Sequence, residues 1–310
     1  MKKQMNRIVR WLVMILSVAG GMVLSAQAKL NVVATTPELA ALAKEVGRDL
    51  ISVKAMAKPT EDPHFVDPKP SHVVTLNHAD ALIEGGLTLE VGWLPPLLAN
   101  ARNPRIEVGQ PGYINASTGV RRLELPDVLT RKKGDIHPLG NPHCFVDPVN
   151  AGIAAANIAD ALAKLDPTSA GLYQANLQKF QARLDAKTKE WQEMLAPFKG
   201  AKIVTYHKDW VYFFERFGLE EIDTLEPLPG IPPSPAHLAE VIEKMRSSGA
   251  KVIIIEPFHN AKTAETVANH VNGKVLMLPQ QPGAIKGTET YIALMDYLVK
   301  TTAAALQETK

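Results

Sequence analysis

Residues 166–197 read DPTSAGLYQANLQKFQARLDAKTKEWQEMLAP, and their pattern predicts one long helix. Asp166-Pro167 is typical of a helix start, and Pro197 ends the pattern. The apolar residues in between mostly lie three, four or seven positions apart, which is helical spacing; they are Leu172, Leu177, Phe180, Leu184, Trp191 and Met194. At about 1.5 Å per residue, some thirty residues form a rod about 45 Å long. This is longer than one small lobe needs, so we expect a rigid helix that joins two lobes; an ordinary surface helix is the alternative.

The composition is that of a folded protein with no strong charge. The chain has 310 residues, of which 46% are hydrophobic, which is enough for two packed domains. The net charge of +2 includes the cations Lys2, Lys3, Arg7 and Arg10, so the rest of the chain is slightly negative. This balance argues against a nucleic-acid partner. Cys144 is the only cysteine, so no internal disulfide is expected.

Residues 1–28 have the features of a secretory signal peptide. A basic start is followed by an uncharged, mostly apolar run over residues 11–24, which is short for crossing a bilayer. Ala26-Gln27-Ala28 is a small-x-small cleavage site, so we predict cleavage after Ala28; an uncleaved anchor is the alternative. No cysteine stands directly after the cleavage site, where Lys29 follows Ala28, and no second long apolar run exists, so we expect a soluble, exported chain without a lipid anchor.

Strands alternate with helices on both sides of the long helix. In the first lobe, residues 29–165, we predict strands at 30–34, 51–56, 81–84 and 106–108. In the second lobe, residues 198–310, we predict strands at 201–205, 251–255 and 274–278. Such alternation predicts an α/β fold, with a mainly parallel sheet flanked by helices in each lobe. Between residues 111 and 140 the signal is weak, and we expect loop and short strands there.

One short phrase occurs twice. Pro63-His64-Phe65-Val66-Asp67-Pro68 is matched by Pro142-His143-Cys144-Phe145-Val146-Asp147-Pro148. The prolines stiffen the chain around each histidine, and Asp-Pro favours a turn or a helix start. His207 stands just beyond the predicted strand 201–205, which is where parallel sheets carry their ligand loops. We therefore predict that His64, His143 and His207 share one ligand.

Imidazole suits zinc, copper, iron and nickel, and three imidazoles with one further ligand describe a tetrahedral Zn²⁺ site. Of the nine histidines, His72, His78, His237 and His270 fall in predicted helices and are expected to be ordinary surface groups; His137 and His259 fall in loops and stay undecided. Cys144 adjoins a predicted ligand but is expected to be a small packed side chain.

A catalytic zinc site would also need an open position for water and a nearby base. The sequence has no His-Glu-x-x-His helix, no Gly-x-Ser-x-Gly turn and no phosphate-binding loop. A zinc-dependent hydrolase is therefore the weaker alternative, and we predict a protein that is not an enzyme and has no catalytic residues.

Five sequence motifs, in order along the mature chain, resemble those of the zinc/manganese ABC-transporter periplasmic solute-binding family. They are Asp62-Pro63-His64 with Pro70-Ser71, Asn141-Pro142-His143 with Asp147-Pro148, Tyr206-His207 with Tyr212-Phe213, Pro233-Ser234-Pro235, and Glu256-Pro257. The resemblance implies two α/β lobes joined by a rigid helix, with one metal ion bound in the cleft. It implies a monomer in the periplasm that delivers the ion to a membrane permease driven by an ATPase subunit at the inner membrane.

By the same resemblance His64, His143 and His207 match the first three metal ligands. Manganese-type members carry Glu where His207 stands, so the resemblance points to Zn²⁺; a carrier of Mn²⁺ or Fe²⁺ is the alternative, and a carrier of organic solutes is a further one. Many zinc-type members carry a histidine- and acid-rich loop after the first ligand, and this chain lacks it at that position.

Many members also place an acidic fourth ligand where this chain reads Pro279-Gln280-Gln281-Pro282. We expect the fourth position to be filled by Glu256, by Asp62 or by water, with Glu256 the preferred protein ligand; a structural role for Glu256 is the alternative. To orient the three imidazoles, Asp67, Asp147 and Asp209 are available.

Overall fold

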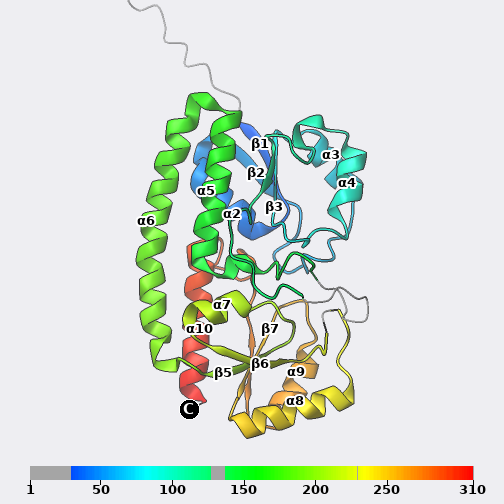
Figure 1. The fold of residues 1–310 in the computed structure, drawn as a ribbon, viewed down its shortest axis with the longest axis vertical. Coiled ribbons are helices and arrows are strands. Elements are labelled where there is room, and N and C mark those ends of the chain that lie inside the picture. Colours follow the sequence, from blue (N-terminus) through cyan, green and yellow to red (C-terminus); the bar gives the residue numbers. More distant parts are fainter. Residues whose placement is uncertain (1–28, 127–136, 229, 310) are drawn as a thin grey trace, which may run out of the picture.

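The computed structural model describes residues 29–126, 137–228 and 230–309, which form two lobes stacked along the long axis of the molecule (Figure 1). The predicted signal peptide, residues 1–28, lies outside the described residues. Each lobe contains a sheet of four parallel strands, in the orders β2-β1-β3-β4 and β6-β5-β7-β8. The predicted α/β fold of two parallel sheets joined by one long helix is confirmed.

The first lobe is built from short strands that alternate with helices. Its strands are β1 (Leu30–Ala34), β2 (Ile51–Ala55), β3 (Ala81–Glu84) and β4 (Tyr113–Asn115), and its helices are α2 (Pro37–Gly47), α3 (Pro70–Asn77), α4 (Leu94–Ala101) and α5 (Pro148–Leu165). Neighbouring strand residues face opposite sides of the sheet: Val32 packs in the core that includes α2 and α5, and Val33 packs in the core beneath α3 and α4.

The second lobe repeats this arrangement. Its strands are β5 (Lys202–Thr205), β6 (Glu220–Thr224), β7 (Val252–Ile255) and β8 (Lys274–Met277), and its helices are α7 (Val211–Phe217), α8 (Pro235–Ser248), α9 (Ala261–Asn269) and α10 (Tyr291–Glu308). All four residues of β7 are buried, as expected for the apolar strand of a sheet covered on both faces. Among the described residues, no helix is both long and apolar enough to cross a membrane.

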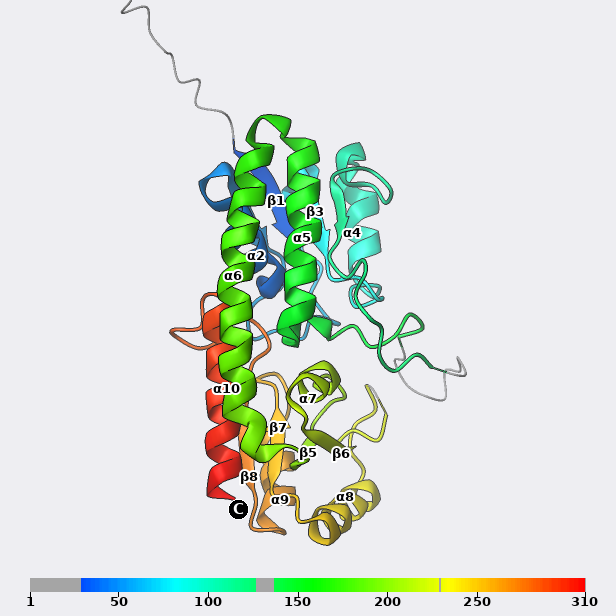
Figure 2. The same cartoon turned by 60° about the vertical axis from the view of Figure 1, so that its left-hand side comes forward.

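Helix α6 (Ala170–Leu195) runs past both lobes, with α10 beside its second half (Figures 1 and 2). Short 3₁₀ turns, Pro167–Ser169 and Ala196–Phe198, extend it at both ends. Its buried side chains, including Phe180 and Trp191, belong to one hydrophobic core that contains residues of both sheets. Because this core does not divide between the lobes, the proposed domain boundaries at 29–165, 166–197 and 198–310 stay a prediction.

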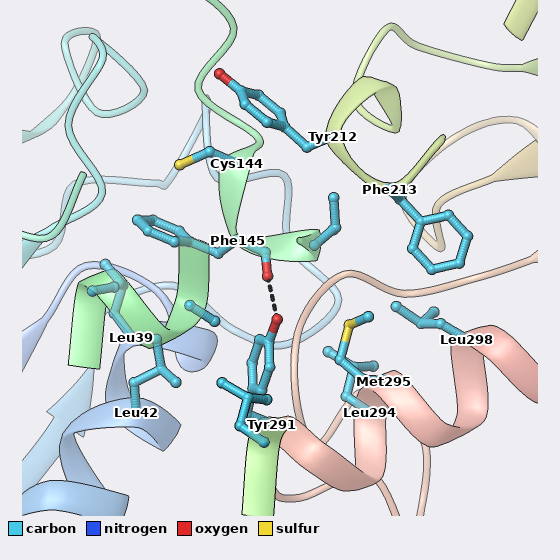
Figure 3. Packing of buried hydrophobic residues seen from close by; sticks show 14 of the residues in the cluster. Leu39, Leu42, Cys144, Phe145, Tyr212, Phe213, Tyr291, Leu294, Met295 and Leu298 are labelled. Carbon is cyan, nitrogen blue, oxygen red and sulfur yellow. Dashed lines mark hydrogen bonds between the residues drawn. The ribbon is translucent and has the colours of Figure 1, made fainter. Parts of the chain in front are cut away.

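Hydrogen bonds also join the lobes close to the second histidine phrase. The Tyr291 hydroxyl of α10 donates to the Phe145 carbonyl at 2.7 Å (Figure 3). The Tyr212 hydroxyl of α7 donates to the Asn141 carbonyl at 3.0 Å, and Arg216 donates to both carboxylate oxygens of Asp147 at 2.7 and 2.8 Å. The two lobes therefore meet through specific contacts and not only through the long helix.

One predicted strand is wrong. Residues 106–108 do not form a strand; Pro104–Ile106 is a 3₁₀ turn, and Val108 is 77% exposed. The Asn103 side chain starts this turn by accepting a hydrogen bond from the Arg105 backbone N–H. The fourth strand is β4, which lies in the region where the sequence signal is weak, and β6 was not predicted at all.

Candidate metal-binding site

Three imidazoles meet in the cleft between the lobes. His64 lies in the loop after β2, His143 lies just before α5, and His207 follows β5. One ring nitrogen from each can be chosen so that the three atoms lie within 4.8 Å of one another. The ring centroids are 4.9 Å apart for His64 and His143, 5.6 Å for His64 and His207, and 5.5 Å for His143 and His207. The structure thus brings the three sequence-predicted histidines into one cluster.

The chain around His64 is held by short-range hydrogen bonds. The Asp62 side chain accepts from the backbone N–H of His64 at 2.9 Å, and the Trp93 indole N–H donates to the Pro63 carbonyl at 2.9 Å. Phe65, the next residue, is 64% exposed. The stiff loop predicted from the prolines therefore aims His64 inward while its neighbour faces solvent.

Carboxylates orient two of the three imidazoles. Asp62 Oδ1 accepts from His64 Nδ1 at 2.8 Å, and Glu226 Oε2 accepts from His207 Nδ1 at 2.8 Å. Each bond places the ring proton on Nδ1 and leaves the Nε2 lone pair for a ligand. Burial alone would raise the pKa of Asp62, but the hydrogen bond and charge of His64 hold it below the ordinary value. Burial alone would lower the pKa of His207, but Glu226 raises it above the ordinary value.

His143 is the most deeply placed of the three. Its backbone N–H donates to Asn141 Oδ1 at 3.0 Å, which fixes the loop, and its Nε2 is buried without a hydrogen-bond partner among the described residues. Burial and the neighbouring imidazoles hold the pKa of His143 well below its usual range. A buried, neutral imidazole with a free lone pair is the form that binds a metal ion.

The predicted orienting acids are wrong. Asp147 bonds to Arg216 and caps α5 by accepting from the Val149 backbone N–H. Asp209 is buried, and burial together with the nearby Glu256 carboxylate raises its pKa well above the usual range. Asp67 makes none of the hydrogen bonds that hold the three imidazoles in the described part of the chain.

The orienting acids are instead Asp62, one of the three alternatives for the fourth metal ligand, and Glu226, which the sequence does not predict. Glu226 follows β6, the strand that pairs with β5, and so it lies at the same edge of the sheet as His207. A sequence signal for the polar strand β6 would have placed Glu226 at the end of a strand, next to His207.

Glu256 directly follows β7 and is 1% exposed. Its Oε1 accepts a short hydrogen bond from the Trp210 indole N–H, and its Oε2 lies 3.2 Å from His259 Nε2. The carboxylate therefore already contacts two side chains of its own lobe. Cys144 is a free thiol, fully buried in the core as predicted, and burial raises its pKa.

Two histidines that the sequence left undecided lie beside the cluster. His137 Nε2 is 3.2 Å from His64 Nε2, and His137 Nδ1 is 3.0 Å from Thr88 Oγ1. Burial and the nearby imidazoles lower the pKa of His137 to about 3. On the other side, His259 stacks on Tyr206 with ring centroids 4.1 Å apart, and its ring lies 6.3 Å from that of His207.

A cavity of about 50 Å³ is lined by His64, His143 and His207, with Asp62 and Glu226 in its wall. This volume suits a single ion or one or two waters. A second cavity, about 420 Å³, is also lined by His143 and His207, and its wall carries Lys208 and the acids Glu124, Glu221, Asp223 and Glu226. A larger, mostly apolar cavity of about 790 Å³ lies in the first lobe next to α4, away from the three imidazoles.

Two α/β lobes with a cluster of three imidazoles between them are the architecture of a two-lobed solute-binding protein. The sequence pattern of the family described as "Zinc-uptake complex component A periplasmic" matches residues 32–305, and the chain belongs to this family. The family resemblance seen in the sequence is therefore confirmed.

Relatives in this group carry names for different metals. The chain is 24% identical over 263 residues to the "High-affinity zinc uptake system protein ZnuA" of Bacillus subtilis, covering 83% of this chain and 80% of that protein. It is 27% identical over 258 residues to the "Manganese ABC transporter substrate-binding lipoprotein scaA" of Streptococcus gordonii, covering 80% and 78%. A solved structure, "Crystal structure of ZnuA", matches with a TM-score of 0.77 at 25% identity, over 90% of this chain and 100% of that one.

Proposed function

We propose that this protein captures Zn²⁺ in the cleft between its lobes and delivers it to an ABC-type membrane permease. The observation that carries the proposal is the cluster of three imidazoles with ligand atoms within 4.8 Å of one another, in a chain of a family described by zinc uptake. The ion is cargo, so binding must be strong and reversible, and no bond of a substrate is made or broken.

His64, His143 and His207 are the proposed ligands, each through Nε2. Asp62 and Glu226 hold two of these rings in the right orientation and tautomer, at 2.8 Å each. Glu256, the fourth ligand preferred from the sequence, stays a prediction; its carboxylate contacts Trp210 and His259 in the cleft wall.

The choice of zinc over manganese rests on the donor atoms. Imidazole nitrogen suits Zn²⁺, whereas Mn²⁺ favours carboxylate, carbonyl and water oxygens. The name of the Streptococcus gordonii relative favours manganese as the second candidate, with Fe²⁺ behind it. Against that alternative, the three ligand side chains that meet here are all imidazoles.

We further propose that the chain works in the periplasm as a monomer, after cleavage behind Ala28, and that a permease and its ATPase subunit at the inner membrane receive the ion. In the wall of the 420 Å³ cavity Glu124 pairs with Lys208 and Asp223 pairs with Lys244, and the remaining carboxylates, Glu221 and Glu226, would attract a cation toward His143 and His207. We propose no catalytic activity: the imidazoles serve to hold the ion, and the function ends with its release.

Isothermal titration of chelator-stripped protein tests this function. We expect one Zn²⁺ per chain, displacement of Mn²⁺ by equimolar Zn²⁺, and loss of binding in the variant with His64, His143 and His207 all changed to Ala. Unchanged zinc binding by that triple variant would refute the proposed site. Retention of Mn²⁺ against excess Zn²⁺ would instead identify a manganese carrier, and metal-dependent ester hydrolysis would identify an enzyme.

A further inference from the structure

His137 is a fourth imidazole that lies next to the three proposed ligands and has no role in the site described so far. It lies outside the cluster defined by His64, His143 and His207, but its Nε2 is 3.2 Å from His64 Nε2. Its ring centroid is 5.2 Å from that of His64 and 6.4 Å from that of His143. The imidazole of His137 is thus directed at Nε2 of His64, the atom proposed to bind the metal ion.

The hydrogen bonds around the two rings determine where their protons lie. The Thr88 hydroxyl donates to the Leu87 carbonyl at 2.5 Å, so its oxygen is available to accept from His137 Nδ1 at 3.0 Å. His64 Nδ1 in turn donates to Asp62 at 2.8 Å. Both rings therefore carry their proton on Nδ1, and both Nε2 atoms present a lone pair.

Two lone pairs facing each other at 3.2 Å repel unless a cation lies between them. The separation also fits a shared metal ion. With zinc–nitrogen bonds of about 2.0–2.1 Å, two ligands of a tetrahedral ion lie about 3.3 Å apart. The distance between the two Nε2 atoms is therefore that expected for two ligands on one zinc ion.

We propose that His137 is the fourth protein ligand, so that Zn²⁺ is held by four imidazoles from His64, His137, His143 and His207. This inference rests on the proposed function, because it needs the other three histidines to bind the ion. Four nitrogen ligands form a closed tetrahedral site with no position for a reactive water. Such a site favours zinc over manganese and suits holding an ion, not catalysis with it.

The other candidates have other contacts. Asp62 Oδ1 accepts from both the backbone and the ring of His64, so it already acts by orienting that ligand. Glu256 Oε1 accepts from Trp210, whereas its Oε2 is buried without a hydrogen-bond partner among the described residues and lies 3.2 Å from His259 Nε2, so Glu256→Gln is the direct comparison below. His137 differs from both because its Nδ1 is held by Thr88 while its Nε2 lies 3.2 Å from the Nε2 of His64, a proposed ligand atom.

The test measures zinc affinity and the number of bound imidazoles in the full chain. The probe is Zn²⁺ alone, titrated against a chromophoric chelator, with X-ray absorption spectroscopy of the loaded protein. His72→Ala is the control, because His72 is also partly buried but lies on α3 and lines neither of the two cavities at the cluster. We expect four imidazoles in the wild type, three in His137→Ala, and an affinity loss of about 10-fold or more in that variant. Thr88→Val, which removes the hydroxyl that accepts from His137 and donates to Leu87, is expected to weaken zinc binding less.

Wild-type affinity and an unchanged imidazole count in His137→Ala would overturn the proposal, as would a loss in Glu256→Gln that His137→Ala does not show. The outcome for His64→Ala separates this proposal from the function itself. If His64→Ala and the triple variant lose zinc while His137→Ala does not, only the fourth ligand is wrong. If none of them loses zinc, the whole site is wrong.

Discussion

Tyr291 and Phe145 are joined by a hydrogen bond of 2.7 Å, although 146 positions separate them in the chain (Figure 3). The bond ties the first turn of α10 to the loop that carries His143, and both side chains are buried. Tyr291→Phe keeps the ring and removes only the donor, leaving the Phe145 carbonyl unpaired. We expect a loss of about 1–3 kcal/mol in the free energy of unfolding.

Thermal and denaturant unfolding measure this loss, and about 1 kcal/mol corresponds to about 2–4 °C in Tm. Tyr297→Phe is the matched control, because Tyr297 lies on the same helix and its hydroxyl makes no hydrogen bond found in the described part of the chain. Equal stability of the two variants would mean that the bond between α10 and the ligand loop contributes nothing.

Zinc binding should weaken as the pH falls, and Glu226 should determine the pH at which this decline begins. The pKa of His207 is raised above 6.5 because Glu226 outweighs the effect of burial. Below that raised pKa the imidazole holds a proton that zinc must displace, so affinity drops by up to about 10-fold per pH unit. In Glu226→Gln the pKa of His207 falls, so the decline should begin at a lower pH.

The Glu226→Gln variant should also bind zinc about 10–100-fold more weakly at neutral pH, since the imidazole of His207 is then less basic and less well oriented. Competition titrations between pH 5.5 and 8 measure both effects. A decline that begins at the same pH in the wild type and the variant would contradict the role assigned to Glu226.

Glu38 should make the fold less stable as the pH rises. Its side chain is buried, and burial raises its pKa to about 8, from 4.5 in the unfolded chain. Between these values the unfolded chain releases a proton that the folded chain keeps, so the free energy of unfolding decreases as the pH rises through this range. Glu38→Gln, which cannot ionise, should therefore be more stable at pH 7, by about 1 kcal/mol or more.

Urea denaturation at pH 5 and pH 8 checks whether Glu38 lowers the free energy of unfolding as the pH rises. The difference between wild type and Glu38→Gln should grow with pH, whereas Glu265→Gln, on the exposed face of α9, should match the wild type at both. A constant difference across the range would show that Glu38 ionises alike in the folded and unfolded chain.

His207→Glu should move the site from zinc toward manganese. The change replaces one nitrogen donor by a carboxylate, which Mn²⁺ favours and which manganese-type members of the family carry at this position. We expect zinc affinity to fall by about 10-fold or more while manganese affinity rises or holds. Competitive titration with both ions measures the ratio; an unchanged ratio would show that His207 does not set the choice of metal.

The three clustered histidines could be predicted because their signals are local. Proline next to His64 and His143, and a buried strand directly before His207, indicate stiff positions at the mouth of a cleft. The orienting acids could not be predicted in this way, because they are neighbours in space. Glu226 reaches His207 only through the pairing of β6 with β5, and β6 reads Glu-Glu-Ile-Asp-Thr, a polar edge strand without an apolar pattern.

The long helix could be predicted from its spacing of apolar residues. The surfaces against which those residues pack could not be predicted. Phe180 and Trp191 lie on the same buried face of α6, and only the fold shows that this face is covered by both lobes. His137 was left undecided for a similar reason: nothing in the weak pattern of residues 111–140 places it beside His64.

The hydrophobic core that runs along α6 makes the two lobes energetically inseparable. Trp191 and Tyr291 are buried in this core, which holds residues of both sheets. Neither half can melt while the other stays intact without exposing that shared interior to water. Heating should therefore give one cooperative transition, and a protease should find either a native chain or a wholly unfolded one, with no stable half-molecule between them.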